Sequence, residues 1–123
     1  MAGLIRYISA LCVGTVMVSC AQPSCESPVT VFRKGECGYD TYRIPALVQT
    51  RGGAILAFAE ARKNGAGDTG DIDLVLKRSV DGGRSWSESI MVWDDGENVC
   101  GNPSPVVDAE SGPVLLVMTW HAG

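Results

Sequence analysis

The stretch that decides the fold runs over residues 42–86. It opens with Tyr42-Arg43-Ile44-Pro45 and continues with Phe58-Ala59-Glu60-Ala61-Arg62. A glycine-rich segment follows, Asn64-Gly65-Ala66-Gly67-Asp68-Thr69-Gly70-Asp71-Ile72-Asp73, and the stretch closes with Ser79-Val80-Asp81-Gly82-Gly83-Arg84-Ser85-Trp86. Arginines and acids therefore surround a glycine-rich loop between short apolar segments. This arrangement predicts a site for an anionic ligand, with carboxylates placed for proton chemistry.

Short apolar runs separated by turns extend on both sides of this stretch. The expected strands are residues 29–32, 46–49, 54–60, 71–79, 89–93, 105–108 and 114–120. The 15 glycines in 123 residues favour turns and strands over helices. Four strands joined by turns form a propeller blade of about 40 to 50 residues. We therefore predict an all-β fold, a β-propeller, of which this chain supplies about the first two blades and a longer protein the rest.

Charge and composition narrow the classes of function. The chain has 10 basic and 14 acidic residues, a net charge of −4, which argues against a nucleic-acid partner. With one histidine and no Cys-x-x-Cys motif, no metal site is expected. Two of the five cysteines, Cys12 and Cys20, belong to an N-terminal signal pattern. The other three are Cys25, Cys37 and Cys100, and their pairing is left open.

The first residues have the pattern of an export signal. Arg6 precedes an apolar run over residues 7–18, and a small residue then precedes Cys20. This junction resembles the lipobox of bacterial lipoproteins, in which the cysteine is acylated; the alternative is an ordinary cleaved signal. The prediction is a signal peptide over residues 1–19, a tether over 20–28, a propeller segment over 29–123, and a lipid-anchored exported protein in the periplasm or at the cell surface.

Residues 42–120 resemble the N-terminal blade region of the sialidases, or exo-acting neuraminidases. Tyr42-Arg43-Ile44-Pro45 is similar to the opening motif of that family. Residues 79–86 resemble its aspartate box, with Ser85 where threonine is usual. The resemblance implies a six-bladed propeller that hydrolyses terminal sialic acid from glycoproteins, glycolipids or oligosaccharides, without a metal or organic cofactor.

The resemblance also implies roles for individual residues. Arg43 matches the first of three arginines that bind the sialic acid carboxylate, and Asp68 matches the general acid/base. Arg62 matches an arginine lining the pocket, Glu60 an acid that contacts a sugar hydroxyl, and Asn102 a position that often contacts substrate. The residues alone leave plainer alternatives open: a surface arginine at Arg43, an Asx turn at Asp68, and a turn residue at Asn102.

The aspartate box is expected to build a hairpin rather than to react. Its four structural residues are Ser79, Asp81, Gly83 and Trp86. The aspartate is expected to bond turn backbone, the glycine to allow positive φ, and the tryptophan to pack between strands.

In sialidases the nucleophile is a tyrosine. That tyrosine, its activating glutamate and two further arginines lie late in the family's sequences, and Tyr7, Tyr39 and Tyr42 are in the wrong places to replace it. The chain alone is therefore expected to be inactive. The alternatives for the whole protein are a sialoglycan-binding propeller without catalysis, a trans-sialidase, and a propeller with an unrelated binding role.

Overall fold

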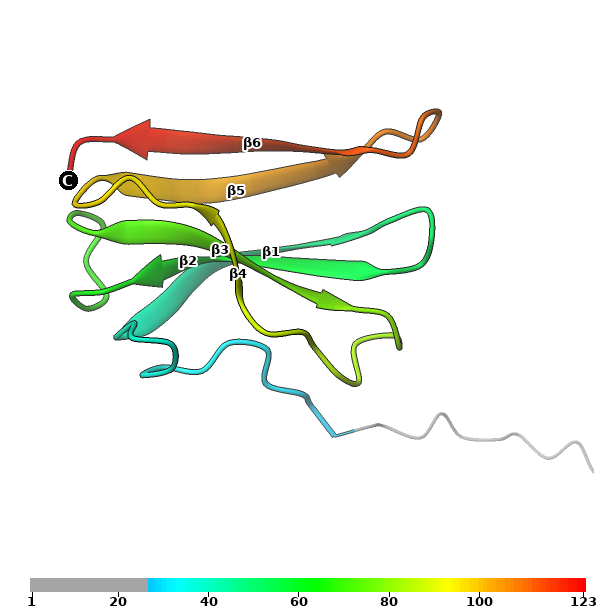
Figure 1. Cartoon of the computed structure of the whole chain (residues 1–123), viewed down its shortest axis with the longest axis horizontal. Helices are drawn as coiled ribbons and strands as arrows, with labels where there is room; N and C mark the ends of the chain where they lie inside the picture. The colour runs from blue at the N-terminus through cyan, green and yellow to red at the C-terminus, as the bar shows by residue number, and fades with distance from the viewer. Residues whose placement is uncertain (1–26) are drawn as a thin grey trace, which may run out of the picture.

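A computed structural model describes residues 27–123 as a single six-stranded sheet with no helix, and so with no helix that could cross a membrane (Figure 1). The strands are β1 Thr41–Gln49, β2 Ile55–Arg62, β3 Ile72–Ser79, β4 Ile90–Trp93, β5 Val99–Val107 and β6 Val114–His121. The prediction of an all-β fold is confirmed. The signal peptide, Cys20, Cys25 and most of the tether lie outside the described residues.

The first four strands form an antiparallel meander, with β1 beside β2, β2 beside β3, and β4 on the other edge of β3. β4 pairs with the middle of β3, whereas the start of β3 pairs in parallel with β5 through Ile72 and Val99. β5 and β6 form a second antiparallel hairpin, drawn above the meander in Figure 1. The chain thus completes one four-stranded unit and begins another.

The central strands β2 and β3 are covered on both faces, so buried residues follow one another along most of each strand. Ala59 and Ala61 of β2 are 1% and 0% exposed, and Leu74 and Val75 on opposite faces of β3 are 0% and 1% exposed. The small alanines allow a neighbouring segment to pack closely on that face of the sheet. This double burial explains why charged groups on these strands need partners.

Residues 29–32 are not a strand, contrary to prediction, because this part of the chain packs on the sheet through aromatic side chains instead of pairing with it. The Phe32 ring stacks on Tyr42 at 5.2 Å, and Tyr39 meets Tyr42 edge-on at 5.8 Å. Tyr39 also donates a hydrogen bond of 2.7 Å to the fully buried Asp73 on β3. Burial in the sheet raises the pKa of Asp73, and the bonds from Tyr39 and Lys63 oppose that rise.

Two matching bulges interrupt the first strand of each hairpin. The register shifts between Arg43 and Ala46 in β1, and between Gly101 and Ser104 in β5. At the bulges Ile44 and Asn102 both have φ of 51°, a left-handed conformation that is unusual for a β-branched residue such as isoleucine. A proline follows each of them in the sequence, and it cannot donate to the sheet ladder. Both bulges lie near the starts of their strands, at the same end of the sheet.

The hairpin after β3 is held by side-chain bonds to its own backbone. Ser79 Oγ donates to Asp81 Oδ1 at 2.8 Å and accepts from Gly83 N at 2.9 Å. Asp81 Oδ1 accepts from Ser85 N at 2.9 Å, and Trp86 Nε1 donates to the Gly83 carbonyl at 3.0 Å. Gly83 has φ of 91°, which favours glycine. These contacts lie outside the cavity described below.

Candidate active site

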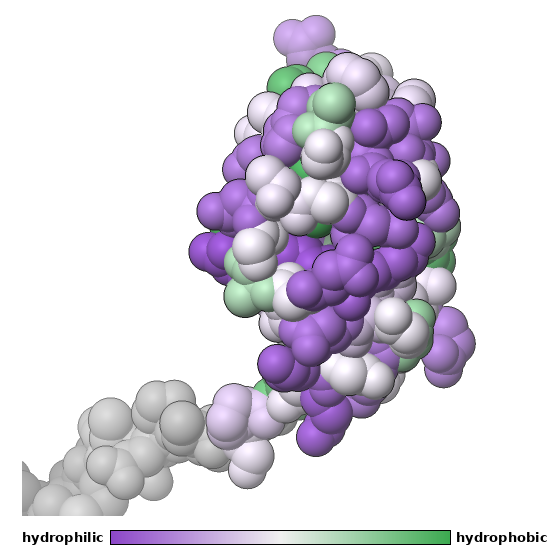
Figure 2. Space-filling view, turned by 90° about the vertical axis from the view of Figure 1, so that its left-hand side faces the viewer, coloured by the Kyte–Doolittle hydropathy of each residue, from purple (hydrophilic) through white to green (hydrophobic). Residues whose placement is uncertain are grey.

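The predicted site residues meet at one end of the sheet, where several strands begin or end. The start of β1, the end of β2, the loop over residues 63–71 and the start of β5 lie at this end, on the left in Figure 1. A cavity of about 270 Å³ opens there, and Figure 2 shows that the surrounding face is largely hydrophilic. Five residues singled out in the sequence line it: Arg43, Glu60, Arg62, Asp68 and Asn102.

Glu60 and Arg62 form a buried ion pair on β2. They are two positions apart on one strand and therefore point to the same face. Each side chain is only 3% exposed. Arg62 Nε donates to Glu60 Oε2 at 3.0 Å, and its Nη2 bonds the same oxygen. Two buried charges thereby compensate each other where neither could remain alone at low cost.

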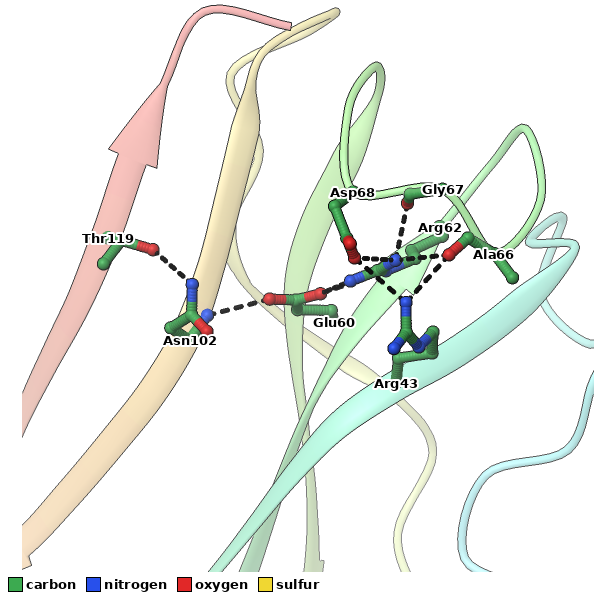
Figure 3. Close-up of polar contacts among 8 residues, drawn as sticks. All are labelled: Arg43, Glu60, Arg62, Ala66, Gly67, Asp68, Asn102 and Thr119. Atoms are coloured by element: carbon green, nitrogen blue, oxygen red, sulfur yellow. Dashed lines mark hydrogen bonds and ion pairs between the residues drawn. The ribbon is translucent and has the colours of Figure 1, made fainter.

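The other end of the Arg62 guanidinium organises the glycine-rich loop. Arg62 Nη1 donates to the Ala66 carbonyl at 2.7 Å and to Asp68 Oδ1 at 2.8 Å (Figure 3). Burial alone would lower the pKa of Arg62, but the bonds to Glu60 and Asp68 outweigh it and raise that pKa. Arg62 is therefore a permanent cation whose donors are directed mainly at protein groups.

Asp68 is the exposed member of the site. Its side chain is 78% exposed, and its Oδ1 accepts from Arg62 at 2.8 Å and from Arg43 Nη1 at 2.9 Å. The hydrogen bond from Arg62, with the positive charge of Arg43, lowers the pKa of Asp68 below its usual value. This carboxyl is therefore ionised at neutral pH.

Arg43 is the cation best placed to meet a ligand. Its side chain is 41% exposed, against 3% for Arg62. Its Nη1 bonds Asp68 and, at 2.9 Å, the Ala66 carbonyl. Guanidinium groups bind carboxylates in a planar, two-point geometry. Both arginines line the cavity and bond the loop through Ala66 and Asp68, but Arg43 is much the more exposed of the two.

Asn102 reaches the site through its backbone rather than its amide. Its N–H donates to Glu60 Oε1 at 2.9 Å, whereas its side-chain Nδ2 donates to Thr119 Oγ1 on β6 at 2.8 Å. Sequence reasoning assigned neither Thr119 nor His121, which also lines the cavity. The bulge in β5 directs the Asn102 N–H at Glu60, and the signal for that bulge in the sequence is the proline after Asn102.

Neither tyrosine in the described part of the chain has an activated hydroxyl. Burial of the phenol, with Asp73 beside it, raises the pKa of Tyr39 above its usual value. Burial also raises the pKa of Tyr42, to about 12. Residues 27–123 contain no group of three or more acidic, histidine or cysteine side chains able to hold a metal, and Cys37 and Cys100 are both free thiols.

Comparison with known proteins gives relatives of one kind. The chain is 41% identical over 90 residues to an exo-alpha-sialidase of Aspergillus fumigatus, covering 68% of this chain and 22% of the relative. It is 41% identical over 87 residues to an exo-alpha-sialidase of Arthroderma benhamiae, covering 66% and 21%. It is 33% identical over 104 residues to a sialidase of Bacteroides fragilis, covering 77% and 19%.

The chain belongs to the sialidase family. No family model matches it, but a solved structure, the Hadza microbial sialidase Hz136, superposes with a TM-score of 0.63 at 28% identity, covering 70% of this chain and 19% of that one. The six strands are accordingly part of a sialidase β-propeller. This sialidase chain spans about a fifth of the length of the first two curated relatives.

Proposed function

We propose that the full-length protein carrying this chain is a retaining exo-α-sialidase that hydrolyses terminal sialic acid from glycoproteins, glycolipids or oligosaccharides. One observation carries the proposal. An exposed carboxylate, Asp68, lies within 2.9 Å of the guanidinium of Arg43, an exposed cation on the same cavity. An acid placed next to an anion-binding arginine suits a substrate that carries its own carboxylate beside the bond to be broken.

In this proposal Arg43 binds the sialic acid carboxylate and Asp68 assists the leaving oxygen, then activates water. The transition state resembles an oxocarbenium ion, and a tyrosine supplies the nucleophile in sialidases. The raised pKa values of Tyr39 and Tyr42 support a nucleophile from elsewhere in the full-length protein. Residues 1–123 alone should therefore release no sialic acid.

The test is an assay of the full-length protein, and of residues 1–123, on sialyllactose. Release of sialic acid by the full-length protein alone is the expected result. Binding of sialyllactose without release would favour a sialoglycan-binding propeller. Transfer of the sugar to an added acceptor in preference to water would favour a trans-sialidase.

Arg43 gives a direct prediction for substrate binding. Arg43→Ala in the full-length protein should lower kcat/KM about 10- to 150-fold and raise KM, since a hydrogen bond to a charged group contributes ~1.5–3 kcal/mol. Arg43→Lys should also fail, because an ammonium cannot reproduce the two-point geometry. Arg51→Ala is the matched control, an exposed arginine bound to the Glu110 carbonyl away from the cavity. An unchanged KM in both Arg43 variants would remove Arg43 from the binding site.

We further propose that the protein is exported and acylated at Cys20. The support is the Val18-Ser19-Cys20 junction after an apolar run. In a bacterial host, radiolabelled palmitate should enter the wild type and Cys25→Ala but not Cys20→Ala. Equal labelling of all three proteins, or labelling of none, would contradict lipid attachment at Cys20.

A further inference from the structure

The bulge in β5 carries a glycine, Gly101, where the bulge in β1 carries the exposed Arg43. The two sequences align as Arg43-Ile44-Pro45-Ala46 and Gly101-Asn102-Pro103-Ser104, and both shift the register across the same four positions. In both, the second residue has φ of 51°. At the first position of these two similar bulges, β1 therefore carries an arginine side chain and β5 carries none.

The space beside Gly101 is filled by Glu60. A Cβ built on Gly101 would overlap Glu60 Oε1 and lie 3.1 Å from Glu60 Cδ. The next residue, Asn102, donates its backbone N–H to that same oxygen at 2.9 Å. Asn102, in its left-handed conformation, thus directs its backbone N–H at the Glu60 carboxylate. Because Gly101 has no Cβ, that carboxylate can approach the backbone of β5.

Glu60 in turn connects β5 to the loop that carries Asp68. Its Oε1 bonds β5, while its Oε2 accepts from Arg62 Nε at 3.0 Å. Arg62 then bonds Asp68 at 2.8 Å. Figure 3 shows this row of side chains running from Thr119 through Asn102, Glu60 and Arg62 to Asp68.

We propose that Gly101 and the backbone of Asn102 are positioning residues for Asp68, which they act on through the Glu60–Arg62 ion pair. The proposal rests on the proposed role of Asp68 as the acid/base of a sialidase. It assigns the β5 bulge a part in placing an acid that lies on a different hairpin.

The test is Gly101→Ala in the full-length protein. The added methyl should displace Glu60, shift Arg62 and misplace Asp68, lowering kcat/KM for sialyllactose roughly 10- to 100-fold, the scale of a displacement of about 1 Å. Because the effect acts through Asp68, an aryl sialoside with an acidic phenol should lose much less. Equal losses on the two substrates would indicate a general structural defect and overturn the proposal.

Two variants separate the close approach from other effects. Gly101→Ala combined with Glu60→Asp withdraws the carboxylate by about 1.5 Å, one C–C bond, and should recover part of the sialyllactose activity lost in Gly101→Ala. Gly52→Ala is the matched glycine control, since its Cβ would meet nothing closer than Thr50 Oγ1 at 4.0 Å. Gly52→Ala should behave as the wild type, and absence of any recovery in the double variant would contradict the steric mechanism.

A structural readout makes the test independent of activity. In a crystal structure of full-length Gly101→Ala, Arg62 Nη1 and Asp68 Oδ1 should no longer lie within hydrogen-bond distance. An unchanged Arg62–Asp68 pair would overturn the positioning role even if activity falls. If the wild type cleaves neither substrate, the proposed function fails, while this distance still decides whether Gly101 positions Asp68.

Discussion

Asp68→Ala in the full-length protein should lower kcat/KM for sialyllactose about 100- to 10,000-fold, the usual contribution of general acid catalysis. The natural sugar leaves as a poor alkoxide and needs a proton. An aryl sialoside with an acidic phenol leaves with little help, so the same variant should keep much more of its activity on that substrate. The measurement is kcat/KM on both substrates.

The pH profiles provide a second readout of Asp68. In the free site, Arg62 and Arg43 lower the pKa of its carboxyl. A substrate carboxylate bound at Arg43 would bring a negative charge close to Asp68 and offset the positive charge of Arg43. The pKa of Asp68 should therefore rise in the complex. Since kcat/KM reports the free enzyme and kcat the complex, the limb that belongs to Asp68 should lie at higher pH in kcat. If the two limbs lay at the same pH, a substrate carboxylate bound at Arg43 would not be raising the pKa of Asp68.

Asp71 and Asp73 are the matched controls for Asp68. Asp73 is fully buried and accepts from Tyr39 at 2.7 Å, and Asp71 accepts from Lys63 at 3.0 Å. Asp71→Ala and Asp73→Ala should therefore lower the yield of folded protein and affect both substrates alike. Equal losses on both substrates for Asp68→Ala would make Asp68 a structural loop residue, and a selective loss at Asp71 or Asp73 would move the acid role there.

The fold could be predicted from the sequence wherever turns and apolar runs are local signals. The turn at Gly52 and Gly53 separates β1 from β2, as expected from the gap between the predicted strands 46–49 and 54–60. The all-β fold was predicted from turns of this kind between short apolar runs. The failures concern backbone that pairs irregularly. β1 starts at Thr41, before Pro45, because a bulge accommodates the proline inside the strand. Similarly, β5 starts at Val99, whereas the sequence predicted a strand only from residue 105.

The candidate site could be predicted only as a set of residues. The sequence placed Glu60 at the end of an expected strand and Arg62 just past it, but it did not indicate the burial that makes them a structural pair. Glu60 is also bonded by the backbone N–H of Asn102 on β5, 42 residues further along the chain, and a Cβ on the neighbouring Gly101 would overlap its carboxylate. Contacts between distant segments of this kind have no local signature, so the difference in burial between Arg43 and Arg62 required the structure.

The buried ion pair gives the second large prediction. Arg62→Met in the full-length protein should lower the free energy of unfolding by about 3–5 kcal/mol, because the Glu60 carboxylate would stay buried without its cation. It should also leave the Ala66 carbonyl and Asp68 held by Arg43 alone, so activity on sialyllactose should fall in the folded fraction. Urea unfolding of the purified variants measures the first effect.

The cost should lie in the unpaired charge rather than in the loss of arginine itself. Arg62→Met combined with Glu60→Gln removes both charges and should therefore recover much of the stability lost in Arg62→Met. The exposed Arg43 is the matched control: Arg43→Met should cost less than about 1 kcal/mol, as is usual for exposed ion pairs. If Arg62→Met and Arg43→Met destabilised the protein equally, Arg62 would not be the buried anchor of the loop. If the double variant recovered nothing, the stabilising role would belong to the bonds from Arg62 to the loop, and Glu60 would matter through β5 alone.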